Sequence, residues 1–341
     1  MNKKQVTAAA VMLAASIIFI FCTRQQKNEY QTLSIYDVFD TYSELSVSGK
    51  NADKALEECN AYLHDVNSRW SATDPNSEIS KLNAAAGVSP VTLSDDTVDI
   101  LDKSVRYSMD TNGFFDVTIG ALADLWDIDK AQIPSKEDIA SAIHKTGFNL
   151  LEINKDAKTA ELTKEGAAVT LGAVAKGYAT KGILDILAKN NISSALVNLG
   201  GNTYALGMNG NSAWNIGIQD PNNQSGTIGT LSVYDTAVIT SGGYQRYFEK
   251  DGVRYHHIIN PYTGSPANSG LLSVTIVNDD PILADALSTA CFVIGYKESL
   301  SLLKDTDSKA VFVTDDNTVY FSTDLQDHFK YDNPSYEYKS F

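Results

Sequence analysis

An aspartate and a threonine lie four residues apart in a segment that is otherwise small or apolar. Asp285 and Thr289 stand within Ala284–Ala290, and the pair Asp280-Pro281 before them is typical of a capped helix start. Helical residues four apart share a face, so a carboxylate and a hydroxyl are expected to project together from a buried helix. Such oxygen ligands suit Mg²⁺ or Ca²⁺. An aspartate hydrogen-bonded to neighbouring backbone amides is the alternative.

A lysine follows a glycine corner in the stretch Leu171–Tyr178, whose sequence is Leu-Gly-Ala-Val-Ala-Lys-Gly-Tyr. The pattern predicts a short strand over 167–171 that leads through Gly172 into a helix from about 173 to 190. Free N–H groups at a helix start can hold a phosphate, and Lys176 would add charge. The segment is not a Walker motif, which needs a second glycine directly before Lys-Ser/Thr. A solvated lysine at a glycine-bounded helix start is the alternative.

Two adjacent histidines lie in a segment that reads as a strand over 255–259, ending at a turn. Neighbouring side chains of a strand point to opposite faces, so only His257 is expected to share a face with Ile259. A histidine beside a pocket is a candidate general base because its ordinary pKa is near neutrality. A solvated or hydrogen-bonded structural histidine is the alternative.

The elements that would position these residues follow from hydrophobic periodicity and turn residues. Helices are expected at 52–70, 94–107, 135–145 and 281–295, in addition to 173–190. Further strands are expected at 195–199, 214–219, 236–240, 271–277 and 309–321, the last broken by a turn at 315–317. Residues 330–341 are expected to form a surface tail. Strands that follow one another without long helices favour an α+β fold with a largely antiparallel sheet.

The chain has 341 residues, with 27 Lys+Arg against 42 Asp+Glu and a formal net charge of -15. This field repels phosphate polymers, so we expect no nucleic-acid partner. An anionic ligand would need a local device such as a divalent cation, a placed lysine or a helix N-terminus. The remaining cysteines of the body, Cys59 and Cys291, form no metal or redox motif; two buried thiols are favoured over a disulfide.

The first residues differ from the rest. Lys3 and Lys4 precede an apolar run from Val6 to Cys22, and a polar segment follows. Residues 1–22 therefore predict an export signal or membrane anchor, and 23–32 a polar linker. Cys22 suggests a lipoprotein, whereas Phe21 stands where a small residue is normally required, so an uncleaved anchor stays open and simple secretion is a third outcome. In each case the body is expected outside the cytoplasm, tethered to the membrane in the first two.

Six blocks of the sequence, in this order, resemble the ApbE-type FAD:protein FMN transferases, also called flavin transferases. The blocks are Gly113–Gly120, Leu171–Tyr178, Val197–Asn202, Ile239–Tyr244, His257–Gly264 and Ala284–Ala290. Each alone is common, but six in one order are specific, and the resemblance extends over roughly residues 34–329.

The resemblance implies one α+β domain of the T-fold-like kind with a smaller subdomain, over residues 33–329, holding FAD in the cleft between them. It implies Mg²⁺-dependent transfer of FMN from FAD to a threonine hydroxyl of an acceptor protein, with release of AMP. Acceptors in this family usually belong to extracytoplasmic or respiratory electron transfer.

The resemblance also implies roles for individual residues. It assigns Mg²⁺ to the carbonyl of Ala173 and the side chains of Asp285 and Thr289, with Ser288 nearby. It assigns contacts with the flavin nucleotide to Asp116, Thr118, Lys176 and Ile259. It assigns the catalytic base to His257.

Three further flavin-binding positions depart from the family pattern. The usual Met-Gly-Thr begins with Phe39 here, an aromatic residue that commonly covers the flavin is Thr73, and an acidic residue three before the metal carbonyl is Thr170. Loss of a stacking ring weakens ring recognition by about 0.5–1.5 kcal/mol. Two other activities therefore stay open: Mg²⁺-dependent hydrolysis of FAD to FMN and AMP, and flavin binding by a non-catalytic lipoprotein.

Overall fold

The computed structural model describes residues 29–331 and 333–341. The predicted export signal or anchor, residues 1–22, and the linker residues before 29 lie outside the described residues. No helix in the described ranges is long and apolar enough to cross a membrane.

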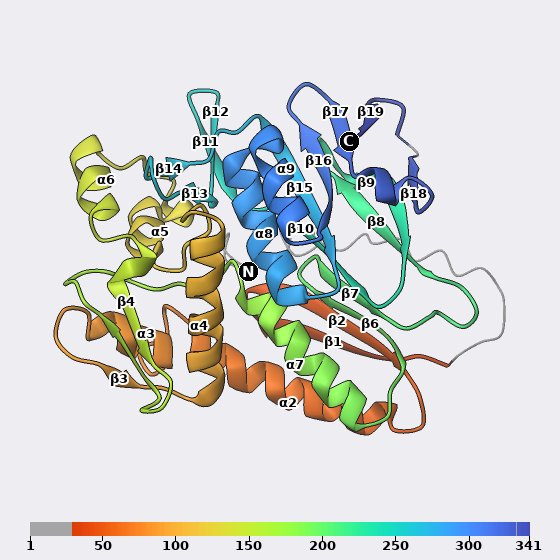
Figure 1. The fold of residues 1–341 in the computed structure, drawn as a ribbon, viewed down its shortest axis with the longest axis horizontal. Helices are drawn as coiled ribbons and strands as arrows, with labels where there is room; N and C mark the ends of the chain where they lie inside the picture. Colours follow the sequence, from red (N-terminus) through yellow and green to blue (C-terminus); the bar gives the residue numbers. More distant parts are fainter. Residues whose placement is uncertain (1–28, 332) are drawn as a thin grey trace, which may run out of the picture.

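A nine-stranded sheet forms the centre of the fold (Figure 1). In spatial order its strands are β1 (Gln31–Val38), β2 (Thr41–Ser48), β6 (Ser194–Leu199), β7 (Asn202–Leu206), β10 (Thr236–Gly242), β15 (Leu271–Asn278), β16 (Lys309–Thr314), β17 (Thr318–Phe321) and β19 (Glu337–Ser340). Every neighbouring pair is antiparallel except β17 and β19. The predicted α+β class with a largely antiparallel sheet is confirmed.

Helices cover one face of this sheet and a second sheet covers the other (Figure 1). The helices are α2 (Ala52–Trp70), α7 (Ala175–Lys189), α8 (Pro281–Ile294) and α9 (Tyr296–Asp305). The second sheet has the strand order β18-β9-β8, with β8 (Trp214–Asp220), β9 (Asn223–Val233) and β18 (Phe329–Tyr331). The expected helices over 52–70, 173–190 and 281–295 are confirmed.

Side-chain alternation along the central strands separates two cores. Ala237 and Ile239 of β10 join the core under the helices, whereas Val238 between them joins the core against the second sheet. Phe312 and Val313 of β16 divide in the same way. Period-two alternation with both faces apolar is what a central sheet between two layers requires.

A smaller part lies beside these layers, at the left of Figure 1. Its helices are α3 (Glu78–Ala84), α4 (Asp95–Asp110), α5 (Gly120–Trp126) and α6 (Lys136–Ile143), with short 3₁₀ turns η1 (Ile128–Lys130) and η2 (Phe148–Leu150). A small sheet holds β3 (Val91–Thr92), β5 (Thr159–Leu162) and β4 (Leu151–Asn154). Two separate strand pairs join β11 (Tyr247–Lys250) to β12 (Val253–His256), and β13 (Ile259–Asn260) to β14 (Ser265–Pro266). The expected helices over 94–107 and 135–145 are confirmed.

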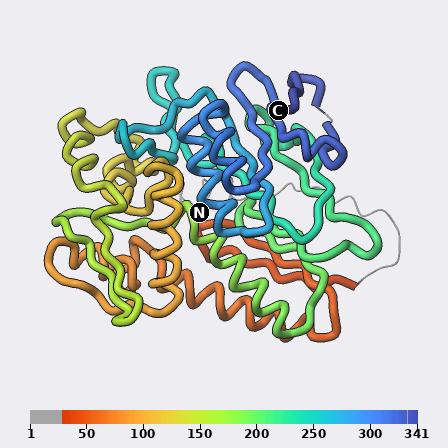
Figure 2. The backbone as a smooth tube through the Cα atoms, viewed as in Figure 1, coloured from red at the N-terminus to blue at the C-terminus, as the bar shows by residue number. Residues whose placement is uncertain are grey.

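The expected surface tail over 330–341 is wrong. The end of β18 pairs with β9, and β19 adds to the central sheet beside β17. Figure 2 shows the dark blue C-terminal chain close to the segment that carries β8 and β9. Tyr336 is buried, and its hydroxyl donates a hydrogen bond to Asp220 over 2.5 Å. The hydrophobic residues of this segment do not alternate regularly because its two short strands belong to two different sheets. The 3₁₀ turn η3 (Thr323–Leu325) lies just before the first of them.

Two other boundaries also differ from expectation. Segment 167–171 is not a strand: it makes one isolated bridge, between Ala168 and Ile119, because only a short stretch of chain lies alongside it. The sheet also begins at Gln31, so the last two residues assigned to the linker pair with β2. Cys59 and Cys291 are free and buried, as expected, and burial raises the pKa of each thiol to about 12.

Helices α7 and α8 approach closely at Gly177. A Cβ atom on this residue would lie 2.3 Å from the carbonyl oxygen of Pro281 and 2.8 Å from Cβ of Asp285. Both distances are far below van der Waals contact, and the first involves backbone that cannot rotate away. Glycine at this position is therefore required by the packing of the two helices.

We expect Gly177→Ala to lower the free energy of unfolding by about 1–3 kcal/mol, because overpacking outweighs the gain in helix propensity. Urea denaturation measures the change. Gly172→Ala is the matched control, since the nearest atom to its Cβ would be 3.9 Å away, and it should stay within about 0.5 kcal/mol of the wild type. Equal stabilities of the two variants would contradict the close approach.

Candidate functional site

The first turn of α7 and the middle of α8 are joined by one hydrogen bond. The backbone N–H of Gly177 donates to Oδ2 of Asp285 over 2.8 Å, and this aspartate is 3% exposed. The start of α8 that positions it has the predicted cap: Asp280 Oδ1 accepts from the N–H groups of Ile282 and Leu283. One of the two carboxylate oxygens of Asp285 therefore accepts from a backbone amide, as the alternative to a metal site expected.

This hydrogen bond leaves the Ala173 carbonyl without the donor that a regular helix would provide. In a regular helix the N–H of residue 177 would donate to the carbonyl of residue 173, but here it donates to Asp285. No other hydrogen bond reaches the Ala173 oxygen, or Oδ1 of Asp285, within the part of the chain that the structure describes. A carbonyl oxygen and a carboxylate oxygen are therefore both left for a ligand at the start of α7.

Hydroxyl groups on α8 extend this set of oxygens. Ser288 Oγ donates to the carbonyl of Asp285 over 2.8 Å, whereas Thr289 makes no such bond to its own helix. Elsewhere the helical Thr180 bonds the carbonyl four residues before it. The Thr289 hydroxyl lies instead 3.3 Å from Ser241 Oγ, which is 2.8 Å from Ser288 Oγ. Asp285 and Thr289 share one face of α8, as their spacing predicted.

The donor set suits a hard divalent cation. Carboxylate, carbonyl and hydroxyl oxygens are the ligands that Mg²⁺ takes, usually with water and substrate phosphate completing the shell. No group of three or more His, Cys, Asp or Glu side chains that could hold a metal occurs within residues 29–331 and 333–341. A cation here would accordingly depend on backbone and hydroxyl oxygens beside Asp285.

Ser241 was not singled out from the sequence, although its block was. It lies near the end of β10, where Thr240 and Ser241 pair with β15 beyond the last residue that β7 pairs with. The hydroxyl of Thr240 is 2.8 Å from that of Thr275 on β15. Hydroxyl residues at a strand end form no periodic pattern in the sequence. Only the contacts of Ser241 with Ser288 and Thr289 show that it belongs to the oxygen cluster of α8.

Lys176 lies in the first turn of α7, half-buried, and the preceding Gly172 is exposed. A lysine beside the positive end of a helix is suited to bind a phosphate. The phosphate site predicted at this corner adjoins the oxygen cluster of α8, because Gly177 follows Lys176 in the chain and is hydrogen-bonded to Asp285.

Asp116 and Thr118 are engaged with the protein itself. Asp116 Oδ1 accepts from the N–H and the hydroxyl of Thr118, and Oδ2 accepts from the N–H of Phe148. The Thr118 hydroxyl accepts in turn from the N–H of Gly147. Burial raises the pKa of Asp116, opposed by these hydrogen bonds. The pair ties the 113–120 loop to the segment after α6.

The other predicted flavin positions are spread over three loops and a small core. Phe39 lies in the β1–β2 turn with φ of 54°, and its N–H donates to Asn67. Thr73 is exposed after α2, and Thr170 is half-buried, its N–H donating to Val117. Ile259 is buried against α5 and α6. No hydrogen bond within the described ranges brings these four together with Asp285.

The two histidines do not lie on one continuous strand, so the expected strand over 255–259 is wrong. β12 ends at His256, and β13 starts at Ile259. His256 is buried: its Nε2 lies 3.0 Å from the carbonyl of Ala267, and its Nδ1 accepts from the N–H of Ile258. This ring is structural.

His257 has a different environment. Both its N–H and its Nδ1 bond the carbonyl oxygen of Arg246, at 3.1 and 3.2 Å. Because a carbonyl only accepts, Nδ1 must carry the proton, which leaves Nε2 with a free lone pair. The ring is half-buried, and exclusion of water by the surrounding protein lowers the pKa of His257 to about 4. A neutral imidazole with an available Nε2 can accept a proton.

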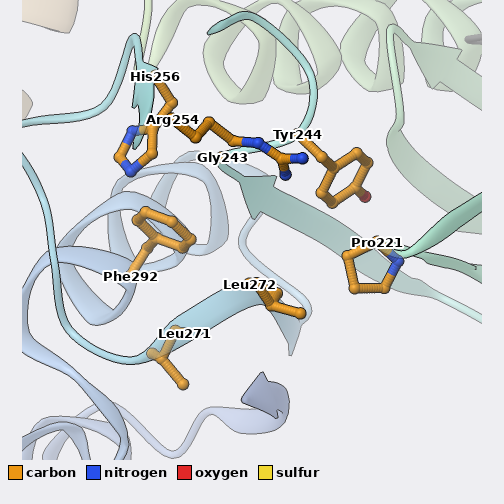
Figure 3. A pocket seen from close by; sticks show the side chains of 8 residues that line it. All are labelled: Pro221, Gly243, Tyr244, Arg254, His256, Leu271, Leu272 and Phe292. Carbon is orange, nitrogen blue, oxygen red and sulfur yellow. The ribbon is translucent and has the colours of Figure 1, made fainter. Parts of the chain in front are cut away.

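Two cavities in the described part of the chain are lined by other residues. One of about 290 Å³ is lined by Arg69, Asp74 and Lys81, among others, next to Thr73. The second, of about 60 Å³, is lined by Pro221, Gly243, Tyr244, Arg254, His256, Leu271, Leu272 and Phe292 (Figure 3). Neither includes Lys176, Asp285 or His257.

Known proteins share this sequence pattern. The profile of the ApbE family matches residues 39–312. The FAD:protein FMN transferase of Treponema pallidum is 36% identical over 292 residues, which cover 80% of this chain and 80% of that protein. A protein of the same name from Klebsiella pneumoniae is 33% identical over 251 residues, covering 72% of this chain and 78% of that one.

Solved structures share the architecture. The ApbE protein of Thermotoga maritima has a TM-score of 0.82 and 30% identity, covering 88% of this chain and 99% of its own. The flavin transferase ApbE of Vibrio cholerae has a TM-score of 0.78 and 26% identity, with the same coverage. The fold and these relatives define an α+β protein of the flavin-transferase type. The chain belongs to the ApbE family.

The hydrogen bonds of Thr118 generate a test. We expect Thr118→Val, which keeps the shape but removes the hydroxyl, to lower the free energy of unfolding by about 1–3 kcal/mol, because it leaves the partly buried N–H of Gly147 unpaired and removes a hydrogen bond to Asp116. Urea denaturation measures this, and exposed Thr163 offers the control Thr163→Val. Weaker FAD binding at unchanged stability would instead make Thr118 a flavin contact.

Proposed function

We propose that this protein transfers FMN from FAD to a threonine hydroxyl of an acceptor protein, releases AMP, and requires Mg²⁺. Its relatives from Treponema pallidum and Klebsiella pneumoniae are named FAD:protein FMN transferases. One observation in the structure carries the proposal: the Asp285 carboxylate takes the N–H of Gly177, so that the Ala173 carbonyl is left without a donor among the described residues beside it. That arrangement supports binding of a cation and a diphosphate at the start of α7.

The reaction breaks one bond of the FAD diphosphate. The threonine oxygen attacks the phosphorus on the riboflavin side, a new P–O bond forms, and the bond to the bridging oxygen breaks, so that AMP leaves with that oxygen. Mg²⁺, when bound, neutralises charge on the diphosphate. We propose Ala173, Asp285 and Thr289 as its ligands, with Ser288 as a neighbour.

Residues of the chain would supply the remaining steps. Lys176, in the first turn of α7, would stabilise charge on the phosphoryl oxygens and the departing AMP. His257 would take the threonine proton on Nε2, since Arg246 holds Nδ1 as a donor. We propose flavin contacts at five positions named from the family pattern, Phe39, Thr73, Thr170, Lys176 and Ile259. Asp116 and Thr118, whose side chains are hydrogen-bonded within the protein, would act by shaping the loop that carries them.

The leader suggests the place of action. Residues 1–22 have the charge and apolar run of an export signal, so we propose that the domain lies outside the cytoplasm, tethered by a lipid on Cys22 or by an anchor. Its acceptors would then be exported or membrane-bound electron-transfer proteins. Fractionation of cells, with mass spectrometry of the mature N-terminus, tests this.

The metal assignment is tested by Asp285→Asn, which retains an oxygen that can accept from Gly177 but loses the charge. We expect FMN transfer to a candidate acceptor domain, followed by mass spectrometry, to fall about 100-fold or more. Binding of Mn²⁺ in the presence of FAD, followed by electron paramagnetic resonance, should weaken in parallel.

Asp220→Asn is the matched control because Asp220 is also a buried, hydrogen-bonded carboxylate, but lies in β8. It should keep transfer and Mn²⁺ binding. Unchanged activity of Asp285→Asn would remove the metal assignment. Release of AMP and free FMN without labelling of any acceptor would favour FAD hydrolysis, and retained FAD without AMP would favour a binding protein.

The pKa of His257 predicts the pH profile of the reaction. The base must be neutral to accept a proton, and with a pKa of about 4 it stays neutral well below the ordinary value near 6.5. We expect kcat/KM to fall only as the pH drops toward about 4, and His257→Gln to lower kcat strongly and remove this acid limb. Exposed His64 provides the control His64→Gln. An acid limb near pH 6.5 would contradict this environment.

A further inference from the structure

A chain of hydroxyl groups connects the end of β10 to the middle of α8. Ser241 Oγ lies 2.8 Å from Ser288 Oγ and 3.3 Å from the hydroxyl oxygen of Thr289. Ser288 in turn donates to the carbonyl of Asp285, also over 2.8 Å. Each hydroxyl carries one proton and can accept two hydrogen bonds. The direction of every bond in the chain is therefore fixed once the direction of one of them is known.

The carbonyl of Asp285 fixes the first direction. A carbonyl can only accept, so the proton between it and Ser288 comes from the serine. Ser288 is 0% exposed, so its hydroxyl cannot turn toward solvent instead. An oxygen–oxygen distance of this length is that of a hydrogen bond, and without a proton between them the two oxygens would repel each other.

The directions of the other two bonds follow from the first. Because the proton of Ser288 lies on the carbonyl, the contact between the two serines requires Ser241 to donate. Ser241 then has no second proton, so its contact with Thr289 requires the threonine to donate. All three protons point from Thr289 toward the backbone of α8. We call these three hydrogen bonds the hydroxyl relay.

The hydroxyl relay orients the side chain of Thr289. A helical threonine can donate to the carbonyl four residues before it, as Thr180 does in α7. For Thr289 that carbonyl belongs to Asp285, and it receives the Ser288 hydroxyl in addition to the N–H of residue 289 in a regular helix. A carbonyl has two lone pairs, so this acceptor is full. The proton of Thr289 goes to Ser241 instead.

This orientation makes the Thr289 oxygen an acceptor for a ligand. Its proton is held by Ser241, and no group among the described residues donates to the oxygen, so both lone pairs stay available. They lie on the face of α8 that also carries the Asp285 carboxylate, because the two residues are four apart. A cation binds lone pairs and repels a hydroxyl proton. A hydroxyl already held in this orientation loses less freedom when a cation binds.

We infer that Ser241 is a positioning residue for the cation: it holds the proton of Thr289, so that the threonine presents its lone pairs to the metal. The inference rests on the proposed function, because that function supplies the cation. Ser241 itself would contact neither the metal nor the flavin nucleotide. While its own proton lies on Ser288, it cannot donate to a phosphate of FAD.

Loss of the hydroxyl relay should weaken cation binding. We expect Ser241→Ala to weaken Mn²⁺ binding in the presence of FAD, followed by electron paramagnetic resonance, by about tenfold, as removal of a group that orients a metal ligand does. Ser241→Thr keeps a hydroxyl and should restore most of the affinity. Ser288→Ala leaves the proton of Ser241 free to turn toward Thr289, so Mn²⁺ binding should weaken in this variant too.

A double-mutant cycle tests whether Ser241 acts through Thr289. Thr289→Val keeps the shape of the side chain but removes the hydroxyl. In this background Ser241→Ala should change the Mn²⁺ affinity no further, because the group that Ser241 orients is already absent. Losses of affinity that add in the double variant would overturn the inference, since a general disturbance of the site would act independently of Thr289.

Thr240→Val is the matched control. Thr240 precedes Ser241 on β10, and its hydroxyl also lies 2.8 Å from a second hydroxyl, that of Thr275, but on the opposite face of the strand. This variant should keep the Mn²⁺ affinity of the wild type even where it lowers stability in urea. The Mg²⁺ concentration for half-maximal FMN transfer should rise in Ser241→Ala, whereas the KM for FAD at saturating Mg²⁺ should not.

Three outcomes separate this inference from the proposed function. If the wild type transfers FMN and Ser241→Ala binds Mn²⁺ equally well, the inference fails while the function stands. Weaker FAD binding by Ser241→Ala in the absence of divalent cations would make Ser241 a flavin contact and would also overturn the inference. If the variants show the expected order of Mn²⁺ affinity but no acceptor is labelled, the transfer proposal fails while the role of Ser241 stands.

Discussion

The contact between the Gly177 N–H and the Asp285 carboxylate determines the chemistry available at the centre of this fold. A buried carboxylate needs a partner, and here it takes the donor that a regular helix would give to the Ala173 carbonyl. One hydrogen bond therefore fixes the aspartate, joins α7 to α8 and leaves a backbone oxygen unpaired at a helix start among the described residues. All three consequences require glycine at position 177, because any side chain there would collide with the backbone of α8.

The hydroxyl groups around this contact depend on the central sheet. Ser241 at the end of β10 reaches both Ser288 and Thr289, so a second contact fixes the position of α8 against the central sheet. Thr289 is thereby drawn off its own helix backbone. In an acidic chain, oxygen ligands without charge would allow a cation to be held with a single carboxylate, and the remaining positive charge would then be available to the proposed diphosphate.

Much of the fold was predictable because it rests on local rules. The apolar stripe of 52–70 and the Asp280-Pro281 cap gave their helices, and alternation gave the central strands. The C-terminal strands and the irregular 167–171 segment were not, since their pairing partners are distant in sequence and their own residues carry no period. The shared face of Asp285 and Thr289 followed from helical spacing, but the unpaired Ala173 carbonyl and the bridging Ser241 depend on contacts between elements, which spacing does not encode.

The two histidines show why geometry must precede chemistry in such a site. The sequence separates them only by the alternation of a strand that ends between them. Hydrogen bonding separates them physically: His256 uses both ring nitrogens within the domain, whereas the Arg246 carbonyl occupies only Nδ1 of His257. The hairpin that contributes Arg246 is anchored by stacked rings on α5. The tautomer of the candidate base is thus set by a backbone carbonyl, and aromatic packing against α5 holds the hairpin that follows this carbonyl in place.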